Sequence, residues 1–309
     1  MAIEYDWLRG CATALVTPFK ANGAVDGKTM RGLVRRQIEA GVRVLVPCGT
    51  TGESATMTRE EDDLIIGITV EVAHGMDAHV VAGVGSNATS VAIDNALRAR
   101  ALGADAVLAV APYYNKPTQA GLIAHYTALA GAIEDTPVVL YNVPGRTASN
   151  INAETVLHLA RTVPNIVAVK EASGDLMQIM HILRERPAEF RVLSGDDALT
   201  FALIALGADG LISVASNEAP AMMSRMVEAA LGGRWHDART LHFKLLALME
   251  ANFWESSPAP VKAAMRMMGL LEESLRLPLV PVQDLTRERL RPVLSELGLL
   301  SELSKSGDE

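Results

Sequence analysis

Eight short apolar runs alternate with stretches of helical length between residues 11 and 214, and this alternation is the strongest constraint on the fold. The runs expected to form strands cover residues 11–17, 42–47, 79–84, 106–110, 137–141, 166–170, 191–194 and 210–214. Helices are expected between them, at residues 30–40, 59–74, 89–102, 120–133, 153–161, 176–185 and 198–206. Apolar strands that alternate with helices are typical of parallel sheets. Eight such units predict an α/β fold, a (β/α)8 TIM barrel.

A short internal repeat supports this prediction. The phrase Ala-Leu-Gly-Ala-Asp occurs at residues 101–105 and again at 205–209, and Glu-Ala-Gly-Val at 39–42 is related to it. In each phrase we expect the glycine to end a helix in the left-handed conformation, after which the chain enters the next strand. The repeating unit is therefore one strand and one helix.

The alternation stops after residue 214. Residues 219–300 instead show three or four amphipathic helices, with breaks at 232–233, 256–260 and 278–281. The sequence therefore predicts a barrel over residues 1–215 and a C-terminal helical extension over residues 216–300. The polar residues 301–309 are expected to form a disordered tail.

Charge and cysteine content exclude several classes of function. The net charge of −8 argues against nucleic acid or an anionic membrane surface as a partner. Cys11 and Cys48 lie in apolar surroundings, so we expect buried thiols in a reducing compartment and no disulfide. Neither cysteine is spaced from a histidine as in a metal motif, so no metal site is predicted.

The N-terminal residues carry acidic side chains and lack the apolar core of a signal peptide. No apolar run approaches the roughly 18 residues that a membrane-spanning helix needs. We therefore expect a cytoplasmic protein that does not cross a membrane.

Lys170 is the only one of the seven lysines that closes a strand-like apolar run. A lysine at such a strand end loses hydration, and this loss favours the neutral amine, which can attack a carbonyl. The alternative is a lysine whose charged end extends into solvent. Active sites of parallel barrels lie at the carboxyl ends of the strands. The residues at the other strand ends therefore help to distinguish a reactive lysine from one that extends into solvent.

A glycine-rich turn, Gly49-Thr50-Thr51-Gly52-Glu53, follows the second strand-like run. Its successive backbone N–H groups can bind a carboxylate, and its two hydroxyls add donors or a proton relay. A turn that only caps the following helix is the commoner explanation for such a segment taken alone.

Tyrosine and arginine follow two further strand ends. Tyr113 and Tyr114 lie in a proline-bounded loop, where a tyrosine is as often packed as it is a proton donor. Tyr141 ends the run before that of Lys170, so we expect its hydroxyl to reach the lysine amine. The planar guanidinium of Arg146 suits a substrate carboxylate, although a surface salt bridge is the commoner role of a loop arginine.

The last two strand ends add weaker candidates. Asp196 or Asp197 is interpreted first as a helix N-cap and only second as a site residue. Gly195 would let the backbone approach a ligand closely. Ile212, if it faces inward, would form an apolar wall beside Lys170. No phosphate-binding loop, dinucleotide fingerprint or Ser-His-Asp pattern occurs in the sequence.

Together these residues suit Schiff-base chemistry on a 2-oxo acid. The lysine amine would condense with the keto group, and the resulting iminium would accept electrons from the neighbouring carbon. The tyrosine would move protons as the enamine forms and attacks an aldehyde. Because the substrate would be bound covalently to the lysine itself, no cofactor is expected.

Three segments carry a resemblance to a known family: Gly-Thr-Thr-Gly-Glu at 49–53, Tyr-Asn-Val-Pro-Gly-Arg-Thr at 141–147 and Val-Lys-Glu-Ala at 169–172. They resemble the dihydrodipicolinate synthase / N-acetylneuraminate lyase family of class I aldolases, and the similarity extends over about residues 10–300. The resemblance implies condensation of pyruvate with L-aspartate 4-semialdehyde, on the route to diaminopimelate and lysine. It also implies a homotetramer built as a dimer of dimers.

The same resemblance implies roles for individual residues. Lys170 would form the Schiff base and Tyr141 would be the general acid and base. Thr50 and Tyr114 would complete a proton relay, with Tyr114 reaching into the site of the neighbouring subunit. Thr50 and Thr51 would bind the pyruvate carboxylate.

Arg146 would hold the semialdehyde at the mouth of the site, and Gly195 and Ile212 would line the pocket. The arginine favours this reaction over those of the sialic-acid lyases and sugar-acid aldolases in the family. One alternative is a pyruvate-dependent aldolase that cleaves a sugar acid or 4-hydroxy-2-oxoglutarate with the same lysine and tyrosine. A second is a non-catalytic barrel that binds a keto acid.

The site through which lysine inhibits some family members is only partly present. The matching positions are Ser54, Ala55, Asn87 and Tyr113. Asp62 stands where inhibited members have His or Lys, and Val91 stands where they have Glu. Because Val91 cannot pair with the ammonium group of lysine, we expect weak or absent inhibition.

Overall fold

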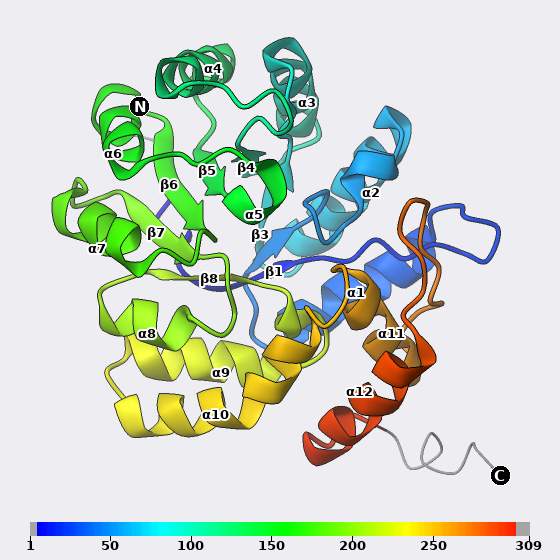
Figure 1. Cartoon of the computed structure of the whole chain (residues 1–309). Helices are drawn as coiled ribbons and strands as arrows, with labels where there is room; N and C mark the ends of the chain where they lie inside the picture. The colour runs from blue at the N-terminus through cyan, green and yellow to red at the C-terminus, as the bar shows by residue number, and fades with distance from the viewer. Residues whose placement is uncertain (1–4, 301–309) are drawn as a thin grey trace, which may run out of the picture.

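Each of the eight strands pairs in parallel with the next one along the chain, and β8 also pairs with β1. In the computed structural model, which describes residues 5–300, the strands therefore form a closed barrel (Figure 1). The strands are β1 (Gly10–Ala14), β2 (Val44–Val46), β3 (His79–Gly83), β4 (Ala106–Val110), β5 (Val138–Asn142), β6 (Ile166–Glu171), β7 (Arg191–Ser194) and β8 (Gly210–Ser213). The predicted (β/α)8 barrel is confirmed.

The first strand is shorter than the apolar run that predicts it. The run extends to residue 17, but β1 ends at Ala14. Beyond that point the Val16 N–H donates to the side-chain oxygen of Asn217 at 3.2 Å, and the Thr17 hydroxyl donates to the Gly52 carbonyl at 2.7 Å. Val16 and Thr17 therefore lie outside the sheet: their hydrogen-bond partners come from other segments and not from a neighbouring strand.

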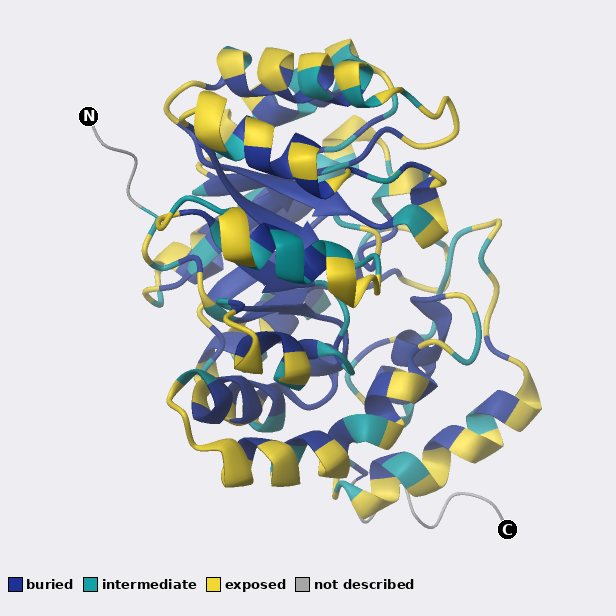
Figure 2. Cartoon of the chain, turned by 60° about the vertical axis from the view of Figure 1, so that its left-hand side comes forward, coloured by how far each residue is buried: buried dark blue, intermediate teal, exposed yellow. Residues whose placement is uncertain are grey.

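Helices cover the outside of the barrel and turn their apolar faces toward the strands, as the buried and exposed sides in Figure 2 show. They are α1 (Gly27–Glu39), α2 (Arg59–His74), α3 (Thr89–Ala101), α4 (Gln119–Ala132), α6 (Ala153–Thr162), α7 (Leu176–Glu185), α8 (Thr200–Ala205) and α9 (Pro220–Leu231). The glycines of the repeated phrase, Gly41, Gly103 and Gly207, have φ angles of 98°, 91° and 105°. The predicted left-handed helix ends are confirmed.

Three further helices follow the ring: α10 (Trp235–Ala251), α11 (Ala259–Met267) and α12 (Asp284–Glu296). Helix α9 packs against β1 and β8, while α10 lies on the outer side of α9 (Figure 1). The short elements are η1 (Ser54–Thr56), α5 (Pro144–Thr147) and η2 (Ala215–Asn217). No helix between residues 5 and 300 has the length and apolarity needed to cross a membrane. The predicted tail, residues 301–309, lies outside the described residues.

Strands β8 and β1 approach so closely at Gly210 that no side chain fits there. A Cβ atom on Gly210 would lie 2.6 Å from the Gly10 nitrogen and closer still to the Gly10 carbonyl oxygen. Both are backbone atoms of the paired strand and cannot rotate away. We therefore expect Gly210→Ala to lower the free energy of unfolding by about 1–3 kcal/mol, measured by urea denaturation.

The matched control is Gly131→Ala on α4, where an added Cβ meets nothing within 4 Å. It is expected to leave the free energy of unfolding unchanged or to raise it by about 0.5–1 kcal/mol. Equal unfolding midpoints for the two variants would contradict the close approach of the strands.

Candidate active site

Lys170 lies at the carboxyl end of β6 and is 5% exposed. It is paired in register with Tyr141 of β5, and its Nζ lies 4.3 Å from the centroid of the tyrosine ring. Tyr141 is itself only 6% exposed, so the ring covers the amine at close range. The alternative of a lysine that extends into solvent is wrong.

The adjoining strand ends leave room for the lysine side chain. A Cβ atom on Gly195, directly after β7, would lie 3.1 Å from Lys170 Cε and 2.6 Å from Ala172 Cβ. Gly195 therefore allows the lysine chain to pass. Ile212 of β8 is 1% exposed and belongs to the same apolar cluster inside the barrel as Tyr141.

The next pair along these strands, Asn142 and Glu171, is joined by side-chain hydrogen bonds. Asn142 Nδ2 donates to both carboxylate oxygens of Glu171, at 3.2 and 3.1 Å. The Ser173 N–H and Gln178 Nε2 donate to the same carboxylate, at 2.7 and 3.1 Å. Burial raises the pKa of Glu171, and the hydrogen bonds from Ser173 and Asn142 oppose that rise. The network fixes β5 and β6 side by side immediately after the lysine–tyrosine pair.

A cavity of about 590 Å³ opens beside Tyr141. Its lining includes Tyr141, Thr50 and Arg146, which the sequence placed at three different strand ends. Arg146 lies on α5 and its Nη2 donates to the Ser257 carbonyl at 3.4 Å. Within residues 5–300 it forms no ion pair, so the predicted alternative of a surface salt bridge finds no support.

Five of the predicted site residues are not in the lining of this cavity: Lys170, Thr51, Tyr114, Gly195 and Ile212. Thr51 follows Thr50 in the turn after β2 and is buried. Tyr114 is 88% exposed and has a φ angle of 74°, an unfavourable value for a tyrosine. Its backbone N–H donates to the Thr147 carbonyl at 3.4 Å. The side chain of Tyr114 thus lies at the surface, away from the lysine of its own barrel.

Asp62 and Val91 both line the cavity, together with Ser54. The Ser54 hydroxyl donates to Asp62 Oδ2 at 3.4 Å, and within the described chain Asp62 Oδ1 is buried without a hydrogen-bond partner. Burial raises the pKa of Asp62 to about 6, although hydrogen bonds from Cys48 and Ser54 oppose the rise.

The two aspartates after β7 have different roles. Asp196 accepts hydrogen bonds from the Ala198 and Leu199 amides, at 2.9 and 3.2 Å, as a capping residue does. Asp196 is therefore the capping residue of the two, whereas Asp197 is 2% exposed and accepts from Ser213 Oγ and from the backbone amides after β8. Asp197, which follows β7, joins that strand end to β8 because Ser213 and the Val214 and Ala215 amides donate to its carboxylate.

Both cysteines are buried free thiols, as predicted. Burial raises the pKa of Cys11 and of Cys48, which keeps both protonated and unreactive. Among residues 5–300, no group of three or more His, Cys, Asp or Glu side chains is placed to hold a metal ion.

Sequence reasoning missed a buried ion pair next to the Gly49–Glu53 turn. Lys262 of α11 donates to the carboxylate of Glu53, and both side chains are 0% exposed. A signal was present in the sequence, since Lys262 lies between Val261 and Ala263 and the residues on either side of it are apolar. A cation in such a place needs a buried partner from elsewhere in the chain.

The closed parallel barrel, the buried lysine with a tyrosine ring against its amine and the adjoining cavity define a class of protein. The chain is a (β/α)8-barrel enzyme whose site lies at the carboxyl ends of the strands.

Comparison with known proteins identifies the family. The model of the dihydrodipicolinate synthetase family matches residues 7–297, and the chain belongs to this family. It is 54% identical to the 4-hydroxy-tetrahydrodipicolinate synthase of Koribacter versatilis (strain Ellin345), over 95% of this chain and 97% of that protein.

Two solved structures illustrate the similarity in three dimensions. The lysine-bound dihydrodipicolinate synthase from Cyanidioschyzon merolae matches with a TM-score of 0.93 and 41% identity, over 96% of this chain and 100% of that one. The chloride-inhibited dihydrodipicolinate synthase from Acinetobacter baumannii, complexed with pyruvate, matches with a TM-score of 0.92 and 42% identity. That match covers 94% of this chain and 99% of the other.

The burial of Asp62 leads to a pH-dependent stability. Because its pKa is raised to about 6 in the folded protein, the folded state holds the proton more tightly than the unfolded chain. Wild-type stability should therefore fall as the pH rises from about 4 to about 6. We expect Asp62→Asn, which stays neutral, to raise the free energy of unfolding at pH 7.5 by about 1–2 kcal/mol, with no gain below about pH 4.

Urea denaturation at both pH values measures this difference. Asp63→Asn is the matched control, because Asp63 pairs with Arg98 at 2.6 Å on the surface and its loss should lower stability slightly or not at all. An Asp62→Asn variant that is less stable than wild type at pH 7.5 would show that the buried carboxylate has a compensating partner.

Proposed function

We propose that this chain is a lyase that catalyses the reaction for which its named relatives are known. Pyruvate condenses with L-aspartate 4-semialdehyde to give 4-hydroxy-tetrahydrodipicolinate, in the biosynthesis of diaminopimelate and lysine. The observation that carries the proposal is the buried Lys170, whose Nζ lies 4.3 Å from the centroid of the Tyr141 ring. The family relative described as a complex with pyruvate supports the choice of the keto acid.

The first half of the reaction activates pyruvate. The neutral amine of Lys170 adds to the keto carbon, and loss of water from this adduct gives an iminium ion. Removal of a proton from the methyl carbon then sends an electron pair toward the iminium nitrogen and leaves an enamine. No oxidant, reductant or cofactor enters this balance, so we propose that none is required.

The second half forms the carbon–carbon bond. The enamine carbon attacks the aldehyde carbon of the semialdehyde, and the aldehyde oxygen takes up a proton as it becomes a hydroxyl. The amino group of the semialdehyde portion can then add to the imine carbon and expel the amine of Lys170. This exchange closes the six-membered ring of the product and regenerates the enzyme.

Protons in these steps would be moved by the hydroxyl of Tyr141, the residue whose ring packs against the lysine amine. Thr50 shares the cavity with Tyr141 and would continue the relay. Tyr114 is 88% exposed, which suits a side chain that completes the relay in a neighbouring subunit. The site would then be complete only in a dimer.

Substrate binding would use the remaining predicted residues. Thr50 and Thr51 would bind the carboxylate of pyruvate through the turn after β2. Arg146, on the cavity wall, would bind the carboxylate of the semialdehyde. Gly195 and Ile212 would shape the pocket around the lysine.

We further propose a homotetramer arranged as a dimer of dimers. Exposed apolar side chains occur in two separate parts of the barrel, as two kinds of subunit contact require. One set is the loop of Tyr113 and Tyr114, and the other is Leu176 and Met177 on α7 with Leu206 after α8. A monomeric variant has been described among the family's solved structures, so assembly is a property of each member.

Reductive trapping tests the proposed covalent step. Pyruvate and borohydride together should add about 72 Da to the peptide that contains Lys170, because reduction fixes the imine. Lys170→Ala should abolish the adduct, while Lys244→Ala, which removes an exposed lysine on α10, should leave it unchanged. Mass spectrometry of the digested protein measures the result.

The aldehyde is tested separately, with a panel offered to the pyruvate-loaded enzyme. We expect turnover with L-aspartate 4-semialdehyde and little with sugar-derived aldehydes or glyoxylate. Turnover only with sugar-derived aldehydes or glyoxylate would favour the alternative, a pyruvate-dependent aldolase that acts on a sugar acid or 4-hydroxy-2-oxoglutarate. An adduct that is absent, or that survives Lys170→Ala, would favour the non-catalytic keto-acid-binding barrel.

Inhibition by lysine is expected to be weak or absent. Val91 lines the cavity near Ser54 and Tyr113 but offers no charge to an ammonium group. We therefore expect steady-state activity to persist at millimolar L-lysine, and Val91→Glu to increase sensitivity. Strong inhibition of the wild type at sub-millimolar lysine would contradict the prediction.

A further inference from the structure

The buried ion pair between the C-terminal helices and the barrel adjoins the proposed carboxylate-binding turn. Lys262 Nζ donates to Glu53 Oε1 and, at 2.8 Å, to the Ser274 carbonyl. Both charged side chains are 0% exposed. Glu53 is the last residue of the Gly49–Glu53 turn, so a residue of α11 holds a residue of the turn after β2.

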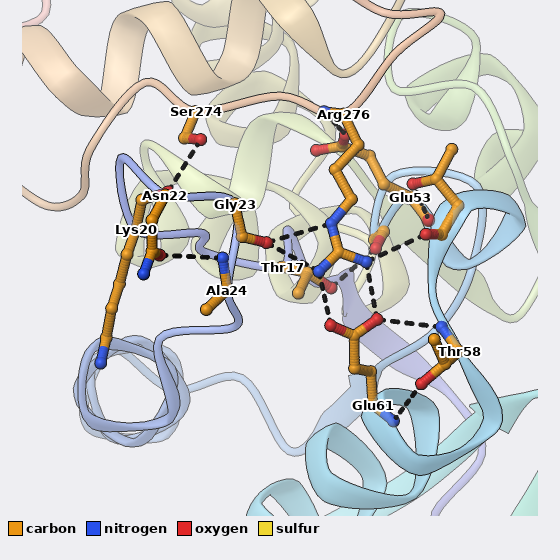
Figure 3. A network of polar contacts seen from close by, with 12 residues as sticks. Thr17, Lys20, Asn22, Gly23, Ala24, Glu53, Thr58, Glu61, Ser274 and Arg276 are labelled. Atoms are coloured by element: carbon orange, nitrogen blue, oxygen red, sulfur yellow. Dashed lines mark hydrogen bonds and ion pairs between the residues drawn. The ribbon is translucent and has the colours of Figure 1, made fainter.

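Arg276 reinforces the same contact. Its backbone N–H donates to the second oxygen of Glu53 at 3.2 Å. Its guanidinium forms a bidentate pair with Glu61 in the first turn of α2, and donates to the carbonyls of Thr56 and Gly23 at 2.9 and 2.7 Å. Figure 3 shows the guanidinium between Glu61 and Gly23, with Glu53 close by. We call Glu53, Lys262 and Arg276 the clamp.

An aromatic ring completes the surroundings of the two cations. Lys262 Nζ lies 4.4 Å and Arg276 Cζ 4.3 Å from the centroid of Phe19. The negative face of the ring attracts both, in addition to the carboxylate of Glu53. Each buried charge of the clamp therefore has several partners, as a buried ion pair requires.

The turn that the clamp holds has an unfavourable backbone conformation. Glu53, its last residue, and Cys48, which precedes it, have φ angles of 55° and 57°, in the left-handed region that residues other than glycine rarely adopt. Inside the turn, the Glu53 N–H donates to the Thr50 carbonyl at 3.1 Å. A displacement of Glu53 therefore moves Thr50 and the adjoining Thr51.

We propose that Lys262 is a positioning residue: through Glu53, it holds Thr50 and Thr51 where they bind the carboxylate of pyruvate. The inference rests on the proposed function, because it assigns a role to residues outside the reacting groups. It follows that the C-terminal helices contribute to pyruvate affinity, although none of them supplies Lys170 or Tyr141.

The test compares Lys262→Met with wild type by borohydride trapping over a range of pyruvate concentrations. We expect the concentration for half-maximal trapping to rise about tenfold or more, because the turn is no longer held in place. The double variant Glu53→Gln with Lys262→Met removes both charges and leaves no unpaired carboxylate. The double variant should show a similar rise in the half-maximal pyruvate concentration. It replaces the single variant as the test if Lys262→Met does not fold.

Arg266→Met is the matched control. Arg266 lies one turn after Lys262 on α11, but it is 54% exposed and its nearest carboxylate, that of Glu272, lies 3.8 Å away. It should leave the pyruvate dependence unchanged. Circular dichroism and urea denaturation establish that each variant is folded.

The outcomes separate the two proposals. A clamp that only stabilises the fold would lower the unfolding midpoint of the variants but leave their half-maximal pyruvate concentration at the wild-type value, and this result would overturn the inference. If the wild-type protein itself forms no adduct, the proposed function fails instead. A rise in both clamp variants, with Arg266→Met unchanged, supports the positioning role.

Discussion

Closure of the parallel sheet is the constraint on which the rest of the molecule depends. Because β8 pairs with β1, the carboxyl ends of all eight strands meet at one rim. Register then determines which side chains become neighbours. Lys170 is paired with Tyr141, and one residue further Glu171 is paired with Asn142. A shift of one residue between β5 and β6 would turn the lysine away from the tyrosine.

The rim contains several ionisable side chains that are buried away from water, and each has different partners. Lys170 lies against an aromatic ring, Glu171 accepts hydrogen bonds from amide groups, and Asp197 accepts them from two backbone amides after β8 and from a serine. Lys262 and Glu53 neutralise one another. A buried ionisable group is tolerated only when hydrogen-bond or charge partners surround it. The same contacts hold the segments around the site in place.

The C-terminal helices are part of this arrangement. Helix α11 supplies Lys262, and the segment after it supplies Arg276, whose contacts reach the loop of Gly23, η1 and the start of α2. Lys262 and Arg276 contact the barrel on the side where the turn after β2 lines the cavity. The extension therefore bears on the geometry of the site, even though the lysine and the tyrosine both come from strands.

The sequence by itself determined the barrel, the left-handed glycines that end its helices, and the strand-end positions of Lys170 and Tyr141. These are local properties, because apolar runs, glycine and strand ends act over a few residues. Only the tertiary structure decided that Asp197 joins two strands, that Tyr114 lies at the surface, and that Lys262 meets Glu53 across 209 positions of the chain. Partners of buried charges come from distant segments, and no local pattern specifies which segments packing will bring together.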